Sequence, residues 1–122
     1  MKRMLIILTI SLSACGSSGS VKNMAMKDYE PKPENILVDI RTPEEFSSGH
    51  VKGAVNVDFF DENFVANFQK QFKKTDVIYI HCKSGGRSSK AVQALEEKGY
   101  KNLIHLDGGI LQWFEAGKPI EK

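Results

Sequence analysis

The stretch that decides the fold is VIYIHCKSGGRSSKAVQALEEKG, residues 77–99. Its first four residues are apolar and rich in β-branched and aromatic side chains, which favours a buried β-strand. From Arg87 to Lys98, apolar side chains recur at helical spacing, and Gly99 is a typical helix stop. A short loop therefore carries Cys82 from the end of a strand to the first turn of a helix.

Apolar runs and helical segments continue to alternate on both sides of this stretch. Strands that alternate with helices form a mostly parallel sheet with helices on both faces. We therefore predict an α/β fold with one domain over residues 36–120 and no internal repeat. The predicted strands lie at residues 36–40, 54–57, 77–80 and 103–106.

Two of the predicted helices have clear start signals. Thr42 provides an N-cap, Pro43 occupies the first helical position, and Glu45 follows three residues after the cap. Asp61 is expected to cap a second helix, in which phenylalanine recurs every fourth residue from 64 to 72. This aromatic stripe is typical of a core-facing helix.

Polar side chains lie at or just beyond the ends of three predicted strands. Asp39 and Arg41 mark the end of the first strand, the Cys82 loop follows the third, and Asp107 follows the last. In open parallel sheets, ligands bind outside the carboxyl ends of the strands. We therefore expect these residues to share one edge of the sheet and to form the functional site.

The residue types of the loop favour a reactive thiolate at Cys82. The N–H groups and the positive dipole end of the following helix stabilise an anion. Gly85 and Gly86 allow successive N–H groups to point toward it, and Lys83 and Arg87 add positive charge at the rim. The alternative is that Cys82 is a small, inert core residue at a strand end.

The first fifteen residues are a different kind of sequence. Lys2 and Arg3 precede an apolar run over residues 4–12, which is too short for a membrane span of about 20 residues and fits a secretory signal peptide. The segment L-S-A-C-G around Cys15 resembles the lipobox of bacterial lipoproteins. The alternatives are a plain signal peptide that contains a cysteine, or a buried N-terminal strand.

The lipobox resemblance divides the chain into three segments. We expect residues 1–14 to be a lipoprotein signal peptide, residues 15–35 to be the lipidated Cys15 and a flexible tether, and residues 36–120 to be the folded domain. It implies an exported protein, anchored to a membrane by lipid and facing the periplasm or the cell exterior. Gly16 after the lipidated cysteine favours the outer membrane in a Gram-negative cell.

Composition restricts the partners of the domain. The 122 residues carry a net charge of +2, which comes from Lys2 and Arg3 alone, so we expect no nucleic-acid binding. Two cysteines, Cys15 and Cys82, do not make a disulfide-stapled scaffold. The three histidines lack metal-ligand spacing. We predict no metal and no cofactor, and we expect a monomer.

Four motifs, in order, resemble those of the single-domain rhodaneses, the thiosulfate sulfurtransferase family. The loop C-K-S-G-G-R-S after residue 81 is the most informative, and residues 38–46 (VDIRTPEEF) match the family's first motif. Residues 49–56 (GHVKGAVN) match a second stretch, and residues 107–119 match the closing motif with D-G-G, a tryptophan and A-G-K-P. Because few residues precede Ile36, the family's usual first strand and helix are expected to be abbreviated or absent.

The resemblance implies a rhodanese-like small parallel sheet flanked by helices on both faces, and a two-step sulfur transfer. The Cys82 thiolate attacks the sulfane sulfur of a small anionic donor such as thiosulfate, which leaves a persulfide on Cys82. A thiol or cyanide acceptor then removes that sulfur. The residues expected to bind the substrate are Lys83, Ser84, Gly85, Gly86 and Arg87.

Asp39 and Arg41 are assigned a supporting role, because an ion pair between them could orient the loop through Arg87. His50 and His105 are interpreted as structural residues, and His81 as the last residue of its strand.

Two other functions stay open. Tyrosine phosphatases and their arsenate-reducing relatives use Cys-x5-Arg to clamp a tetrahedral oxyanion. Here Cys82 and Arg87 form Cys-x4-Arg, so the loop is one residue shorter and suits a single sulfur atom better than a phosphate. The second alternative is a rhodanese fold kept as a non-catalytic sulfur-binding or interaction module; the intact Cys82 argues against it.

Overall fold

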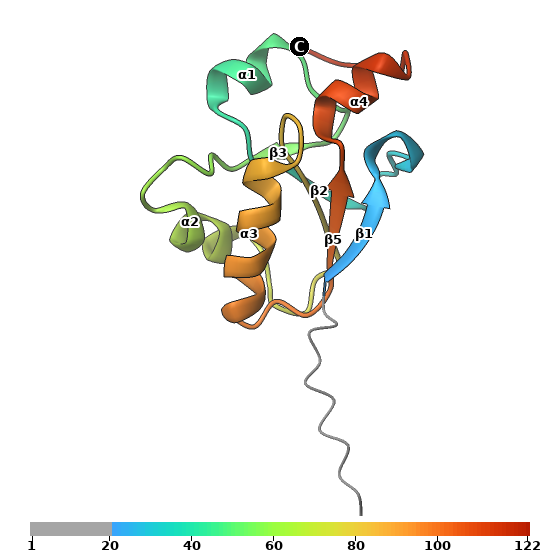
Figure 1. Ribbon diagram of the computed structural model, residues 1–122. Coiled ribbons are helices and arrows are strands. Elements are labelled where there is room, and N and C mark those ends of the chain that lie inside the picture. The colour runs from blue at the N-terminus through green and yellow to red at the C-terminus, as the bar shows by residue number, and fades with distance from the viewer. Residues whose placement is uncertain (1–20) are drawn as a thin grey trace, which may run out of the picture.

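A five-stranded parallel sheet forms the centre of the domain, with strand order β1-β5-β4-β2-β3 (Figure 1). The computed structural model describes residues 21–122, so the predicted signal peptide and Cys15 lie outside the described residues. The predicted α/β class with a parallel sheet is confirmed. The strands are β1 (Val21–Ala25), β2 (Ile36–Asp39), β3 (Val55–Asn56), β4 (Ile78–His81) and β5 (Leu103–Asp107).

Helices cover both faces of this sheet. One face packs against α2 (Phe64–Gln71) and α3 (Gly86–Glu97), and the other against the 3-10 turn η1 (Met26–Asp28) and α4 (Gly109–Glu115). The short helix α1 (Pro43–Ser48) buries no residue. Burial of apolar side chains on both faces is the main stabilising force. The largest fully buried side chains are Trp113, Tyr100, Phe68, Met26, Leu37, Ile40, Ile78, Ile80, Leu95, Leu103, Leu106 and Ile110.

The tether predicted over residues 15–35 is wrong from Val21 onward. Strand β1 pairs with β5 along its whole length, from Val21 opposite Leu103 to Ala25 opposite Asp107. Met26 is fully buried, and Tyr29 is 3% exposed. The expectation that the first strand is abbreviated or absent is also wrong. Because β1 is an edge strand with two exposed polar residues at its centre, its sequence carries little apolar pattern.

The helix start signals were read correctly at α1 and less well at α2. The Thr42 hydroxyl accepts a hydrogen bond from the Glu45 N–H, and the Glu45 carboxylate accepts one from the Thr42 N–H, which completes the capping box. Helix α2 has Asn63 as its N-cap rather than Asp61. The Asp61 carboxylate instead accepts from the Asn63 N–H at 2.8 Å and forms the preceding turn.

The strand order places a topological switch point between the carboxyl ends of β2 and β4. The chain leaves β2 toward β3 at one edge of the sheet and leaves β4 toward β5 on the other side, while Asp39 of β2 lies opposite His81 of β4. In open α/β sheets, ligands bind at such a switch point. The segments that follow β2 and β4 therefore meet where a site is expected.

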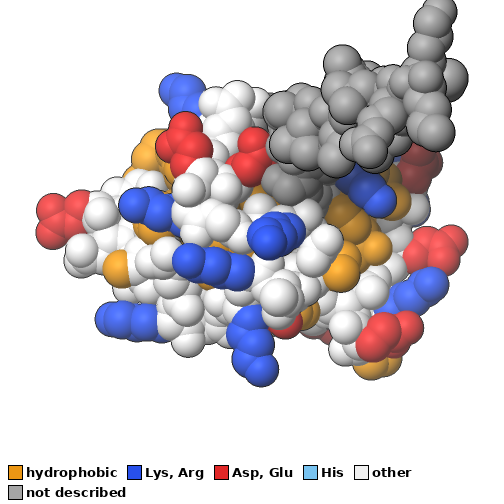
Figure 2. All heavy atoms as spheres, turned by 90° about the horizontal axis from the view of Figure 1, so that it is seen from below, with side chains coloured by type: hydrophobic (Ala, Val, Ile, Leu, Met, Phe, Trp, Pro, Cys, Tyr) orange, Lys and Arg blue, Asp and Glu red, His pale blue; other side chains and the backbone are white. Residues whose placement is uncertain are grey.

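The strands begin, and the described chain starts at Val21, at the end of the molecule opposite to the Cys82 loop (Figure 1). Figure 2 shows this end of the molecule from below. Lys and Arg side chains are interspersed there with acidic and apolar ones. None of the helices between residues 21 and 122 is long and apolar enough to cross a membrane.

Candidate active site

Cys82 is the first residue beyond β4, and its thiol is surrounded by the loop that leads into α3. Its side chain is 1% exposed. Gly85, with φ +119°, is the N-cap of α3, a conformation that favours glycine. The Gly85 N–H donates to the Cys82 Sγ at 3.1 Å and the Ser88 N–H donates at 3.4 Å. The expected amide cradle for a sulfur anion therefore consists of these two N–H groups at the start of a helix.

The carbonyl groups of Cys82 and Lys83 accept hydrogen bonds from the first turn of α4. The Ile110 N–H donates to the Cys82 carbonyl at 2.9 Å, and the Leu111 N–H donates to the Lys83 carbonyl at 3.1 Å. A Cβ at Gly109, where φ is +62°, would lie 2.3 Å from the Lys83 oxygen. The D-G-G segment thus lets α4 approach the loop closely enough to fix its amide directions.

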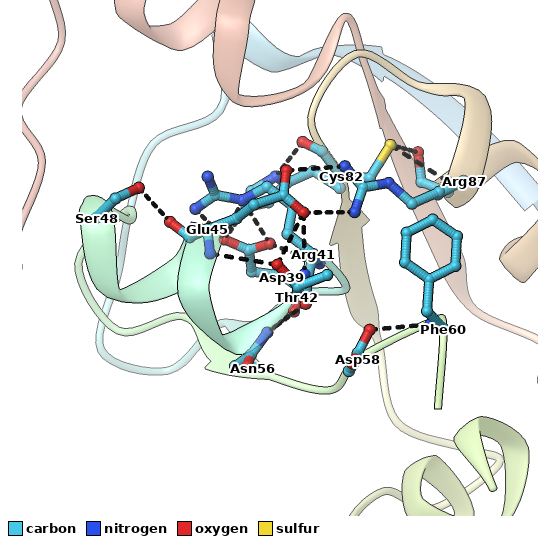
Figure 3. A network of polar contacts seen from close by, with 12 residues as sticks. Asp39, Arg41, Thr42, Glu45, Ser48, Asn56, Asp58, Phe60, Cys82 and Arg87 are labelled. Carbon is cyan, nitrogen blue, oxygen red and sulfur yellow. Dashed lines mark hydrogen bonds and ion pairs between the residues drawn. The ribbon is translucent and has the colours of Figure 1, made fainter. Parts of the chain in front are cut away.

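Arg87 is held by Glu45 at the mouth of the site (Figure 3). Its guanidinium makes a bidentate pair with the Glu45 carboxylate, at 2.7 and 3.0 Å, and lies 5.1 Å from the ring centre of Phe60. The Arg87 guanidinium lowers the pKa of Glu45 to about 2, and the carboxylate raises the pKa of Arg87. Sequence reasoning identified Glu45 only as a capping residue and missed this second contact.

Asp39 and Arg41 form the expected ion pair, but the hydrogen bonds of the Arg87 guanidinium go to Glu45, and Asp39 acts on Arg87 only through the weaker attraction of its charge. The Asp39 carboxylate accepts from the Arg41 guanidinium at 2.8 Å and from the Arg41 backbone N–H at 3.0 Å, and both side chains are buried. The guanidinium also donates to the Gly49 carbonyl at 2.7 Å. The pair therefore braces the segment between β2 and α1, while Glu45 makes the contact with Arg87 (Figure 3).

Ser88 and His105 are a second feature that sequence reasoning missed. The Ser88 hydroxyl lies 3.2 Å from the Cys82 Sγ and 2.6 Å from the His105 Nε2. The His105 Nδ1 lies 3.2 Å from the Asn23 Oδ1 on β1. Strand alternation places His105 on the same face of β5 as Leu103, toward α3. This alternation is the feature of the sequence that could have indicated that His105 lies near Ser88.

The other two histidines make contacts to the backbone. The His50 Nδ1 bonds the Phe46 carbonyl at 2.9 Å and its ring stacks on Phe46, as expected for a structural residue. His81 is the last residue of β4, and its Nδ1 bonds the Cys82 carbonyl at 3.0 Å. Burial lowers the pKa of His81, although the carboxylate of Asp39, 3.7 Å from the His81 Nε2, raises it.

Lys83 and Ser84 lie on the exposed part of the loop, and neither side chain contributes to the cradle around the sulfur. Within residues 21–122, no group of three or more His, Cys, Asp or Glu side chains is arranged to hold a metal ion.

The fold and the site define a class of protein. The protein is an α/β domain with a buried cysteine at a helix start, and its loop lies at a switch point of a parallel sheet. Because N–H groups are directed at the cysteine sulfur, the site is suited to thiolate chemistry. The family model for the rhodanese-like domain matches residues 20–116. The chain belongs to the rhodanese-like domain family.

Two of the relatives carry sulfurtransferase names. The chloroplastic thiosulfate sulfurtransferase 16 of Arabidopsis thaliana is 36% identical over 91 residues, which are 67% of this chain and 76% of that protein. A sulfurtransferase of Allochromatium vinosum is 34% identical over 85 residues, 70% of this chain and 77% of that protein. The family also includes a tRNA uridine(34) hydroxylase of Bartonella bacilliformis, 40% identical over 87 residues, of which this chain spans only 28%.

Solved structures agree with the fold. The rhodanese-like domain protein of Staphylococcus aureus superimposes with a TM-score of 0.63 at 30% identity, over 75% of this chain and 90% of that chain. The rhodanese-like domain of an Anabaena protein gives a TM-score of 0.66 at 27% identity, over 74% of this chain and 67% of that chain. The resemblance found in the sequence is confirmed as a rhodanese-like domain with sulfurtransferase relatives.

Proposed function

We propose that this protein is a sulfurtransferase that moves sulfane sulfur from a donor such as thiosulfate to a thiol or cyanide acceptor through a persulfide on Cys82. The observation that carries the proposal is the pair of N–H groups, from Gly85 and Ser88, directed at the Cys82 sulfur. Family membership and the relatives with sulfurtransferase names support it.

In the first half-reaction, the Cys82 thiolate attacks the outer sulfur of the donor. With thiosulfate, the S–S bond of the donor breaks, sulfite leaves with the bonding electron pair, and the anionic persulfide Cys82–S–S⁻ remains. N–H groups stabilise such an anion as an oxyanion hole stabilises an alkoxide. We assign this role to the loop from Lys83 to Ser88, with the Gly85 and Ser88 N–H groups directed at the sulfur and with Lys83 supplying exposed positive charge for an anionic donor.

In the second half-reaction, an acceptor attacks the outer sulfur of the persulfide. A thiolate acceptor becomes a persulfide and cyanide becomes thiocyanate, and in each case Cys82 leaves as the thiolate. The enzyme therefore shuttles between a free and a sulfur-loaded form, which predicts ping-pong kinetics.

The contacts of Arg87 argue against phosphatase or arsenate chemistry. A phosphate-binding loop needs a guanidinium that is free to donate two parallel N–H hydrogen bonds to the oxygens of the anion. In this loop two of the three guanidinium nitrogens of Arg87, Nη1 and Nη2, donate to the Glu45 carboxylate, and the Cys-x4-Arg spacing is one residue short. The intact cradle around Cys82 likewise favours catalysis over a purely binding module.

Steady-state kinetics test the proposal. Thiocyanate formation from thiosulfate and cyanide should give parallel double-reciprocal lines, and Cys82→Ser should abolish turnover because the nucleophile is lost. Ser88→Ala is unsuitable as a control because Ser88 touches the sulfur; Ser89→Ala, one residue along α3 and exposed, is the matched control. Hydrolysis of phosphate esters by the wild type, without thiocyanate formation, would overturn the proposal.

We also propose that the protein is an exported lipoprotein, anchored to a membrane through Cys15 and facing the periplasm or the cell exterior. The signal-like residues 1–14 and the segment L-S-A-C-G support this assignment. The described domain starts at Val21, at the end opposite to the Cys82 loop (Figure 1). The intact mass of the native protein, compared with a Cys15→Ser chain, tests the assignment: an unmodified, uncleaved native chain would refute it.

A further inference from the structure

A line of polar atoms leads from the Cys82 sulfur through Ser88 of α3 and His105 of β5 to Asn23 of β1. It runs from Sγ to the Ser88 Oγ (3.2 Å), on to the His105 Nε2 (2.6 Å), and from His105 Nδ1 to the Asn23 Oδ1 (3.2 Å). Cys82 is 1% exposed, Ser88 is fully buried and His105 is 6% exposed. The amide cradle uses the backbone N–H of Ser88 and not its hydroxyl, so the side chains of Ser88, His105 and Asn23 have no role in the chemistry described above.

The hydrogen-bonding capacities give this line a direction. An amide oxygen such as the Asn23 Oδ1 only accepts, so the His105 Nδ1 carries a hydrogen and its Nε2, in the neutral ring, accepts. The Ser88 hydroxyl donates to Nε2, which is its nearest acceptor; the Gly85 carbonyl is farther, at 3.3 Å. The lone pairs of Ser88 Oγ are then free to accept from the Cys82 thiol.

We propose that Ser88, His105 and Asn23 form a proton relay that converts the Cys82 thiol into the nucleophilic thiolate. The thiol proton moves to the Ser88 Oγ while the hydroxyl proton moves to the His105 Nε2. Ser88 stays neutral, Cys82 becomes the thiolate and His105 becomes the imidazolium, with its Nδ1–H still donated to Asn23. Ser88 Oγ–H then donates to the thiolate sulfur, as a third donor beside the two backbone N–H groups.

The relay acts at one stage of the cycle, and this statement rests on the proposed function. While Cys82 carries a sulfane sulfur, it has no thiol proton to give. When the acceptor removes that sulfur, Cys82 leaves as the thiolate, and the imidazolium can return the proton through Ser88. Ser88, His105 and Asn23 are therefore positioning and proton-relay residues, whereas Cys82 alone forms the covalent bond.

The surroundings of His105 suit this role. Burial lowers the pKa of His105, which keeps the ring neutral and able to accept, while the charge of Asp107 on the same strand raises it. A hollow of about 270 Å³ adjoins His105 and is also lined by Asn23 of β1 and by Gln93 and Glu96 of α3. Cys82, Glu96 and Asp107 are thus the titratable groups around the ring. The hollow lies on the side of His105 away from the loop, so water can exchange the relayed proton while a donor occupies the site.

The test is a pH titration of the thiolate, followed by its ultraviolet absorbance. The full chain with Cys15→Ser is used, so that Cys82 is the only thiol. His105→Gln keeps an amide that can accept from Ser88 but takes up no proton, and Ser88→Ala cuts the relay. Both should move the midpoint of thiolate formation upward by about one pH unit, which is about tenfold less thiolate below the midpoint.

Asn23 offers a test in both directions at an exposed position, where folding is not at risk. Asn23→Ala should raise the midpoint, because Nδ1 loses its acceptor. Asn23→Asp should lower it, because a carboxylate at Nδ1 stabilises the imidazolium. A purely structural role would leave all midpoints at the wild-type value and alter only stability. Four titrations that superimpose on the wild type would overturn the relay.

The outcomes for the relay and for sulfur transfer are separable. Shifted titrations in a protein that never forms a persulfide would retain the relay and refute the proposed function. Unshifted titrations, in a protein that loads sulfur from thiosulfate, would refute the relay and leave the proposed function standing.

Discussion

At the scale of single residues, Glu45 has two structural roles, and its position in the sequence predicts only the first of them. Its carboxylate completes the capping box of α1 and also forms the bidentate pair with Arg87 at the mouth of the site. The positive charge of Arg87 is therefore largely offset, and Lys83 is left as the exposed cation of the loop. In the proposed reaction, the charges of Arg87, Glu45 and Lys83 together are expected to set how strongly a dianionic donor is attracted.

Replacing Glu45 by Gln tests that balance. Gln retains the capping box but removes the charge that holds Arg87. The KM for thiosulfate should fall about three- to tenfold at low salt, because the freed guanidinium attracts the dianion, and the gain should shrink as salt is added. Steady-state kinetics at two ionic strengths measure it. Glu44→Gln removes an equal charge from an exposed neighbour that does not pair with Arg87, and a similar effect in both variants would contradict a specific role for Glu45.

Asp39 is expected to matter for stability more than for the loop. Asp39→Ala would leave the buried Arg41 guanidinium without its carboxylate partner, which typically costs about 3–5 kcal/mol of unfolding free energy. Turnover should fall, while the folded fraction should still form a persulfide. Denaturant titration and intact mass measure the two effects, and an unfolding free energy equal to that of the wild type would show that the brace is unimportant.

At the scale of elements, the site depends on the close approach of α4 to the loop after β4. The first N–H groups of α4 bind the carbonyls of Cys82 and Lys83, and Gly109 leaves room for that contact. The cradle is thus shaped by a helix that follows it by more than twenty residues, because both segments lie at the same edge of the sheet.

A pair of glycine substitutions tests this dependence. Gly109 and Gly117 have similar left-handed backbones, φ +62° and +69°, but only Gly109 would place a Cβ against the loop. Gly117→Ala should cost about 1–2 kcal/mol, the strain of that conformation for an L-residue. Gly109→Ala should cost more and should also slow persulfide formation, since the loop must move. Equal losses of stability, with unchanged loading rates in both variants, would contradict the role given to α4.

Sequence reasoning succeeded where a signal was local. The apolar run before Cys82, the capping signals of α1 and the glycine-rich loop each lie within a few residues, and the structure contains the strand, the cap and the cradle they predict. It failed at β1, since an edge strand with exposed Lys22 and Asn23 shows little alternation. It also missed the Glu45 pair and the His105 line, because both join residues that only the strand order brings together.

At the scale of the whole molecule, two buried histidines couple stability to pH. Burial lowers the pKa of both His81 and His105 below the ordinary value of 6.5. As the pH falls below about 6.5, these two histidines therefore bind protons in the unfolded chain more readily than in the folded chain. Because the unfolded state binds more protons, the unfolding free energy decreases with falling pH in that range. Glu45 acts later: its contribution is present above its ordinary pKa of 4.5 and is lost as the pH falls toward about 2.

Urea unfolding between pH 5 and 8 measures this coupling. The midpoint should be nearly constant near pH 8 and should decrease below about pH 6.5. His81→Asn, which keeps a donor for the Cys82 carbonyl but no titrating ring, should flatten the slope in that range. A wild-type midpoint that is independent of pH down to pH 5 would contradict the burial of neutral histidines.

The central claim for the molecule is that Cys82 holds a transferable sulfur atom, and the intact mass of the protein tests it most directly. After incubation with thiosulfate, the wild-type chain should gain about 32 Da, one sulfur atom, and should lose it again on addition of cyanide or a thiol. Cys82→Ser should gain nothing under the same conditions. A wild-type chain that stays at its original mass, while hydrolysing phosphate esters, would contradict the account.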